Sequence, residues 1–144
     1  MLDFDSEYDP VVRAKLKDLV IDFCAALDAL SHPEESADFF SEDGLLDLTE
    51  LDAPLMRGRP EIAAFFGEAF DSTSHQAHYL SNFRFRRRSS NEYHITNLVN
   101  SIVINKNGNM INICGRYNID VIEVHGLLKF SNFKEDIIIP IGES

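Results

Sequence analysis

Two side chains suited to proton transfer stand at positions that a fold could bring together. His78 opens a long segment of alternating apolar and polar residues, and histidine exchanges a proton near neutral pH. Asp28 lies near the end of an amphipathic helical segment, beside its apolar stripe, so its carboxylate can lean toward a sheet. From spacing alone, a solvated aspartate at a helix end and a hydrogen-bonded core histidine remain open interpretations.

Further candidates for a ligand site are polar or aromatic residues within apolar patterns. Asn100 and Tyr117 are mid-strand polar groups, and a buried polar group without a partner costs about 1–3 kcal/mol. That partner is either protein or a ligand carbonyl or hydroxyl. Aromatic walls for such a site are expected from Phe23, Phe65, Phe66 and Phe70.

The sequence offers no pattern for a metal or a cofactor. His75 and His78 are three residues apart, which places them on opposite faces of a strand and makes them a poor metal pair. No Gly-rich phosphate loop is present. Cys24 and Cys114 are expected to be separate buried thiols, because no Cys-x-x-Cys pair exists. We therefore expect neither metal nor cofactor.

Arg84, Arg86 and Arg88 share one face of the same alternating segment. An arginine-rich hairpin end is more typical of a solvated sheet edge than of an anion site. The chain of 144 residues carries a formal net charge of −11, which opposes binding to nucleic acid and to anionic membranes. It has neither a signal-peptide profile nor an apolar run of about 20 residues, so we expect a soluble, cytoplasmic protein.

The elements that must position these residues follow from periodicity. A first helix is expected from Asp9-Pro10 to Leu30, and a second, capped by Ser31 with Glu34 reaching back, ends near Phe39-Phe40. A short strand at 44–48 and a third helix from Gly58-Arg59-Pro60 follow.

From residue 76 onward the period becomes two. Strands are expected at about 76–88, 91–105, 109–124 and 127–139. Asn107-Gly108 predicts a tight hairpin turn in which both residues take positive φ, and His125-Gly126 predicts another.

This order of elements, with the segments that fill it, resembles the SnoaL-like branch of the NTF2-like superfamily. That branch includes polyketide cyclases, scytalone dehydratase and the small subunits of ring-hydroxylating dioxygenases. The likeness is carried by CAALDAL (24–30), FFSEDGLLDL (39–48), RGRPEIAAFF (57–66), HYLSNFRF (78–85), GRYNIDVIE (115–123) and HGLLKFSN (125–132).

The resemblance implies one α+β domain over residues 1–144. In that fold, three N-terminal helices pack on a strongly bent antiparallel sheet of four long strands plus one or two short ones. The resulting cone holds a pocket between helix and sheet, and members are commonly homodimers through the outer sheet face. The resemblance also implies that Asp28 and His78 meet in this pocket.

The activity it implies is that of a cofactor-free lyase, isomerase or cyclase. Asp28 and His78 would perform acid–base catalysis on a largely apolar, carbonyl-bearing small molecule that is polyketide-, steroid- or terpenoid-like. Asn100 or Tyr117 would hold the developing oxyanion.

Two alternatives stay open. One is a non-catalytic small-ligand-binding or oligomerisation module, which is favoured because Asn100 stands where the dehydratase pattern carries a second pocket histidine. The other is a structural small subunit of a dioxygenase.

Overall fold

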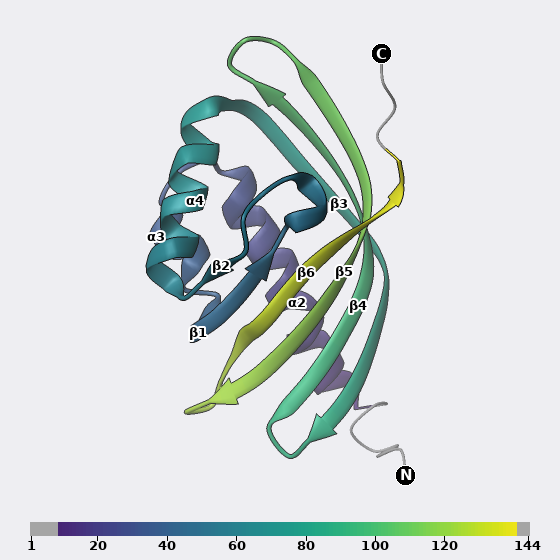
Figure 1. The fold of residues 1–144 in the computed structure, drawn as a ribbon. Coiled ribbons are helices and arrows are strands. Elements are labelled where there is room, and N and C mark those ends of the chain that lie inside the picture. Colours follow the sequence, from purple (N-terminus) through teal and green to yellow (C-terminus); the bar gives the residue numbers. More distant parts are fainter. Residues whose placement is uncertain (1–8, 141–144) are drawn as a thin grey trace.

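A curled, unclosed sheet of six strands wraps one long helix in the computed structural model of the protein, which describes residues 9–140 (Figure 1). The strand order is β2-β1-β6-β5-β4-β3. Two further helices cover the open side of the cone. The predicted α+β class, with three helices on a bent sheet, is confirmed.

In chain order the elements are α2 (Pro10–Asp28), α3 (Pro33–Ala37), β1 (Phe40–Asp47), the 3-10 turn η1 (Thr49–Leu51), β2 (Met56–Arg57), α4 (Arg59–Ser72), β3 (Thr73–Ser89), β4 (Glu92–Asn105), β5 (Met110–Val124) and β6 (Leu127–Ile139).

The central helix α2 begins where the sequence predicts. The Asp9 side chain caps it by accepting a hydrogen bond of 2.9 Å from the Val11 backbone N–H, and Pro10 occupies the first turn. The helix ends at Asp28, two residues before the expected end at Leu30. Within residues 9–140, no helix is both long and apolar enough to cross a bilayer.

The predicted capping box of the second helix is wrong. His32, in the left-handed conformation with φ 55°, occupies the cap position of α3, and no side chain caps the helix. Pro33 sets the first turn, so Ser31 lies one residue too early to cap it. The helix stops at Ala37, and Phe40 already belongs to β1.

The two hairpin turns of the meander differ from each other. His125 and Gly126 both have positive φ, as predicted for a two-residue turn. In the β4–β5 turn, Gly108 has positive φ but Asn107 does not. The loop is longer there: Gly108 donates its N–H to the Asn105 carbonyl at 2.9 Å, in a turn that leaves only the glycine in the left-handed region.

The first strand joins the sheet in a way that periodicity did not predict. β1 pairs parallel to the last strand β6, with Phe40 opposite Phe130, and so extends the sheet beyond the four-stranded meander (Figure 1). A register shift separates Phe40 from Leu45. Gly44 lies in this shift, where a Cβ would stand 2.9 Å from the Phe130 carbonyl oxygen. Only glycine allows the two strands to approach so closely.

Phe23, on α2, is the centre of the core. Its ring meets five others edge-on at centroid distances between 5.2 and 6.0 Å. Aromatic pairs prefer this geometry because the positive edge of one ring faces the negative face of another. The partners come from β1, α4, β6 and the residue before β1, namely Phe39, Phe40, Phe66, Phe130 and Phe133. This cluster fixes the helix inside the curled sheet.

Candidate active site

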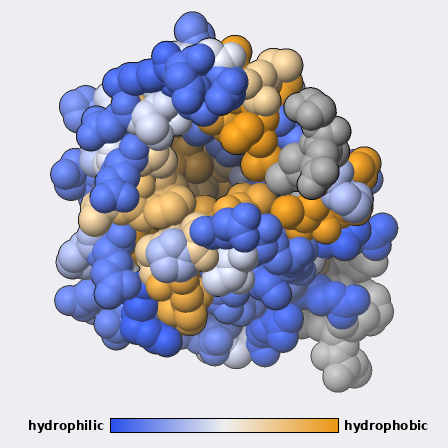
Figure 2. Space-filling model, turned by 45° about the horizontal axis from the view of Figure 1, so that its top comes forward, coloured by the Kyte–Doolittle hydropathy of each residue, from blue (hydrophilic) through white to orange (hydrophobic). Residues whose placement is uncertain are grey.

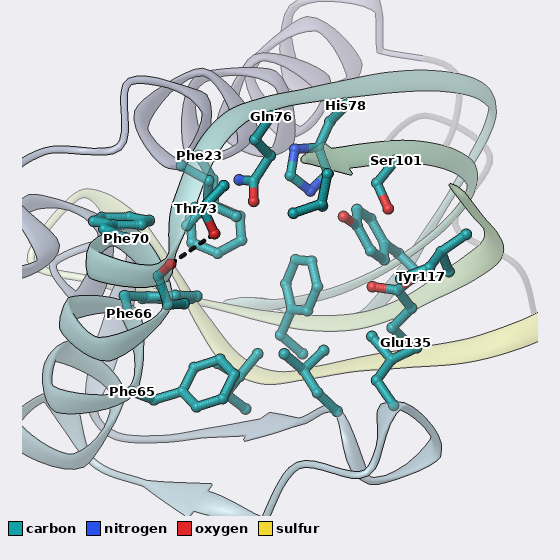
Figure 3. Close-up of a pocket in the computed structure, with 18 residues that line it drawn as sticks. Phe23, Phe65, Phe66, Phe70, Thr73, Gln76, His78, Ser101, Tyr117 and Glu135 are labelled. Carbon is teal, nitrogen blue, oxygen red and sulfur yellow. Dashed lines mark hydrogen bonds between the residues drawn. The ribbon is translucent and has the colours of Figure 1, made fainter. Parts of the chain in front are cut away.

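A cavity of about 220 Å³ lies between α2, α4 and the concave face of the sheet. Figure 2 shows a hollow on the surface with apolar residues around it. Phe23, Phe65, Phe66 and Phe70 all border the cavity, as the sequence predicts. Its polar groups come mainly from the strands and are seen in Figure 3, namely Thr73, Gln76, His78, Ser101, Tyr117 and Glu135.

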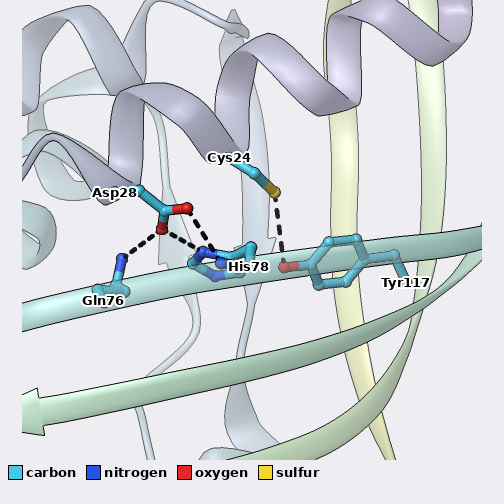
Figure 4. Close-up of polar contacts among 5 residues, drawn as sticks. All are labelled: Cys24, Asp28, Gln76, His78 and Tyr117. Carbon is cyan, nitrogen blue, oxygen red and sulfur yellow. Dashed lines mark hydrogen bonds and ion pairs between the residues drawn. The ribbon is translucent and has the colours of Figure 1, made fainter.

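Asp28 and His78 meet, as the family resemblance implies. His78 Nδ1 lies 2.6 Å from Asp28 Oδ1, and the His78 backbone N–H donates to Asp28 Oδ2 at 3.0 Å (Figure 4). Gln76 Nε2 donates more weakly to Oδ1, at 3.5 Å. The Asp28 carboxylate, at the end of α2, therefore hydrogen-bonds to both the backbone and the ring of His78.

The position of His78 on an edge strand explains its backbone hydrogen bond to Asp28. β3 is an edge strand, and the backbone N–H groups on its outer side have no strand to pair with. The last residue of α2 supplies an acceptor to one of them, at His78. The His78 side chain is 9% exposed and that of Asp28 is 27% exposed. The pair is therefore sheltered, but the carboxylate keeps contact with water, which lowers the cost of its charge.

The contact decides which ring nitrogen carries the proton. A carboxylate accepts, so Nδ1 of a neutral His78 carries the proton and Nε2 keeps its lone pair. None of the described residues forms a hydrogen bond with Nε2. His78 borders the cavity, whereas Asp28 does not. The histidine is thus the member of the pair that can reach a ligand, and Asp28 positions it.

His78 also borders a second hollow, on the outer side of the molecule. This groove runs between α2 and β3, and Lys17, Ile21 and Tyr79 are among the residues that line it. His78 therefore contributes to the walls of both the apolar cavity and a groove that opens toward solvent.

Tyr117 points into the cavity from β5 and is buried, at 2% exposed. Its hydroxyl makes a long contact of 3.9 Å with Cys24 Sγ (Figure 4). Burial raises the pKa of Tyr117 well above its ordinary value and raises the pKa of Cys24 to about 12. Both groups therefore keep their protons near neutral pH. Tyr117 is a hydrogen-bond donor, and Cys24 is not a thiolate nucleophile.

Glu135, on β6, is the residue of the site that the sequence analysis missed. It is 6% exposed, borders the cavity, and its Oε2 has no hydrogen-bond partner. Burial raises the pKa of Glu135 from 4.5 to about 7, while the charge of His78 opposes this rise. It is the cross-strand partner of Tyr117. A Cβ on Gly115 would stand 2.8 Å from Oε2, so the glycine leaves room for the carboxyl group.

Asn100 does not lie where the sequence analysis expected it. It is exposed and is not part of the cavity wall, because the inward positions of β4 are the odd ones. Its neighbour Ser101 points inward, is buried and lines the cavity. It is the cross-strand partner of His78 on β3. Asn100 therefore does not line the cavity in which a ligand would bind.

Other titratable groups stay outside the cavity. His94 and Asp120 form a second pair, at 2.7 Å between Nδ1 and Oδ1, that does not border it. His75 is exposed and contacts Ser74. Among residues 9–140, no group of three or more His, Cys, Asp or Glu side chains is arranged to hold a metal ion. Arg84, Arg86 and Arg88 are exposed, as expected for a solvated edge.

A bent sheet wrapped around a helix, with a His–Asp pair at an apolar cavity, defines an NTF2-like α+β protein. The sequence model of the SnoaL-like domain matches residues 12–134, and the chain belongs to that family. No curated protein matches the chain.

Solved structures show the same fold. A protein from Novosphingobium aromaticivorans DSM, provisionally described as an aromatic ring hydroxylase, has a TM-score of 0.86 at 28% identity, with 90% of this chain and 91% of that chain covered. A provisionally named scytalone dehydratase from Novosphingobium aromaticivorans DSM 12444 has a TM-score of 0.82 at 22% identity, covering 91% and 87%. The hexachlorocyclohexane dehydrochlorinase LinA-type3 from Novosphingobium barchaimii LL02 has a TM-score of 0.77 at 17% identity, covering 90% and 88%.

The tautomer of His78 can be tested directly. In Asp28→Asn, the amide can donate to Nδ1, so we expect the neutral ring to move its proton to Nε2. Long-range ¹H–¹⁵N correlation spectra of the imidazoles at alkaline pH report the protonated nitrogen. Asp120→Asn is the matched control and should change only the spectrum of His94. A parent protein with His78 protonated at Nε2 would contradict the arrangement described above.

Glu135 should make stability depend on pH. Its folded-state pKa is raised, so the folded protein holds this proton more tightly than the unfolded chain does. The stability it contributes is full below about pH 4.5 and is lost as pH rises through about 7. The shift corresponds to on the order of 3 kcal/mol. Urea unfolding of the parent and of Glu135→Gln between these pH values should show the parent losing that much stability relative to the variant. If the unfolding free energies of the parent and of Glu135→Gln change in parallel with pH, the pKa of Glu135 is not raised in the folded protein.

Proposed function

We propose that the protein is a cofactor-free lyase or isomerase that moves a proton next to the carbonyl group of a small, largely apolar molecule. The observation that carries the proposal is the contact of 2.6 Å between His78 and Asp28, with the imidazole on the wall of an apolar cavity. A histidine that is held in one tautomer, with a free Nε2, is prepared to act as a general base.

The comparisons support this class of reaction. The names of two structural neighbours denote the loss of water and the loss of hydrogen chloride, which are eliminations. An elimination and a carbonyl isomerisation share one step, the removal of a proton from carbon. One fold hosts many chemistries, so the proposal depends on the site and not on the fold.

The cavity limits the size of the substrate. Ligand sites commonly measure about 300–1,000 Å³, and a cavity of about 150 Å³ in another protein accepts benzene. At about 220 Å³, this cavity suits one ring with a few substituents. Of the ligands that the family resemblance implies, we therefore propose a single-ring carbonyl compound in preference to a steroid or a multi-ring polyketide.

The proposed chemistry needs only side chains. His78 Nε2 takes the proton from the carbon next to the carbonyl, and Asp28 steadies the imidazolium that forms. Tyr117 donates a hydrogen bond to the carbonyl oxygen as negative charge develops there. Phe65, Phe66 and the other aromatic walls exclude water, which strengthens these contacts.

Proton abstraction can be measured without the natural substrate. In D₂O the enzyme should catalyse exchange of the α-protons of cyclohexanone or acetophenone, which is followed by NMR. His78→Ala should lower the exchange rate more than about a hundredfold, because general base catalysis contributes 10²–10⁴. His94→Ala is the matched control, since it removes a histidine from a similar His–Asp pair outside the cavity. Equal losses in both variants, or no exchange by the parent across the panel, would favour a non-catalytic binding module.

We also propose a cytoplasmic homodimer that pairs through the outer face of the sheet. Tyr79, which is 63% exposed and alternates with His78 on β3, lies on that face. Light scattering should give the mass of two chains. Tyr79→Glu should shift the mass toward one chain, because it would place a charge in the proposed contact face of each chain. Val11→Glu, on the exposed side of α2, should leave the mass unchanged. A monomeric parent would end this proposal.

A further inference from the structure

Glu135 occupies the part of the cavity that comes from β6, whereas His78 comes from β3 at the opposite edge of the meander (Figure 3). Glu135 is buried, with 6% of its surface exposed, and its Oε2 has no hydrogen-bond partner among the described residues. Leaving such a group unpaired costs about 1–3 kcal/mol, and more for a charged one. A carboxyl group with only a packing role would be expected to have a partner.

We propose that Glu135, in its protonated form, is the proton donor to the carbonyl oxygen of the ligand. The inference deepens the proposed function and rests on it for the catalytic step. It adds a second catalytic group that faces the same ligand as His78. Tyr117, the cross-strand neighbour of Glu135, would donate a hydrogen bond to the same oxygen.

The step is balanced without a cofactor. His78 Nε2 takes a proton from the α-carbon, the C–H electrons form the C=C bond of an enol, and the carbonyl oxygen takes the Glu135 proton. His78 is then cationic and Glu135 anionic. In the second half, Glu135 takes back the enol proton. The imidazolium gives its proton either to a carbon, which completes an isomerisation, or to a departing hydroxyl, which leaves as water.

The same geometry defines the charge of the ligand. Among the described residues, no Lys or Arg side chain borders the cavity. An anionic ligand would lose its hydration without gaining a counter-charge, and Glu135 would have to stay protonated beside it. A neutral ligand with a hydrogen-bond acceptor matches both Glu135 and Tyr117.

The charge state of Glu135 depends on groups from five elements. Its pKa is raised to about 7, mainly by burial and to a smaller extent by the charges of Asp136 on β6 and Glu50 on η1. Positive charge on His78, from β3, opposes the rise. Tyr117 on β5 and Cys24 on α2 keep their protons and add no charge near neutral pH. The protonated form is therefore present at neutral pH and declines as pH rises.

The first test is the pH profile of α-proton exchange with cyclohexanone. The parent rate should fall about tenfold per unit above pH 7, as the acid is lost. Glu135→Gln should lower kcat at least a hundredfold below pH 7 with little change in KM, and its profile should lack that falling limb. Glu123→Gln, an exposed change on β5, is the matched control and should behave as the parent. A Glu135→Gln profile that coincides with the parent's would overturn the inference.

The second test needs no turnover. In protein with ¹³C-labelled glutamate carboxyls, the titration of Glu135, assigned from its absence in Glu135→Gln, is followed by NMR with and without cyclohexanone. A donor to the ketone oxygen binds it best when protonated, so its titration midpoint should move to higher pH on binding. An upward shift supports the inference even if the parent catalyses no exchange, an outcome that would count against the proposed function alone. A midpoint that saturating ketone leaves unmoved, or moves downward, overturns it.

Discussion

Two hydrogen bonds between the Asp28 carboxylate and His78 join the end of α2 to the edge strand β3. Asp28 ends α2, and through two hydrogen bonds it holds both the backbone and the ring of His78 on the edge strand β3. The hydrogen bond to the His78 backbone positions the strand. The hydrogen bond to the ring then orients the imidazole on a strand that is already in place. Loss of the ring contact alone would leave the fold in place and free the imidazole to turn. The tautomer of His78 and the direction of Nε2 follow from this contact.

Most of the fold could be predicted from the sequence, because its signals are local. The apolar stripe of α2, Pro10 behind a capping aspartate, and the change to a period of two after residue 76 each depend on neighbours within a few positions. The parallel pairing of β1 with β6 joins residues about ninety positions apart, such as Phe40 and Phe130, and no local pattern encodes it. The β4–β5 turn was mispredicted because Asn-Gly permits two kinds of hairpin, and the hydrogen bond to Asn105 selects the longer one.

The site was predicted in part, and the two misses have different causes. On β4 both faces are apolar: Val99 and Val103 point inward, but Ile102 and Ile104 are half-buried on the other side. Alternation therefore could not tell whether Asn100 or Ser101 faced the ligand. Glu135 was missed although a signal existed, since it stands two residues after Phe133 and shares its inward face. A carboxyl at an inward strand position opposite Tyr117 is evident only when the pairing of β5 with β6 is known.

The position of His78 between two hollows has a consequence for repeated cycles. One side of the residue meets the apolar cavity, and the other meets the groove between α2 and β3, where Lys17 and Tyr79 reach water. The Nδ1 side of the ring meets the partly wetted Asp28 carboxylate, whereas Nε2 is the nitrogen that takes the substrate proton in the proposed reaction. Removal of the Nδ1 proton would leave the ring protonated on Nε2, so the base is restored only when Nε2 gives its proton to the product or to the leaving group inside the cavity.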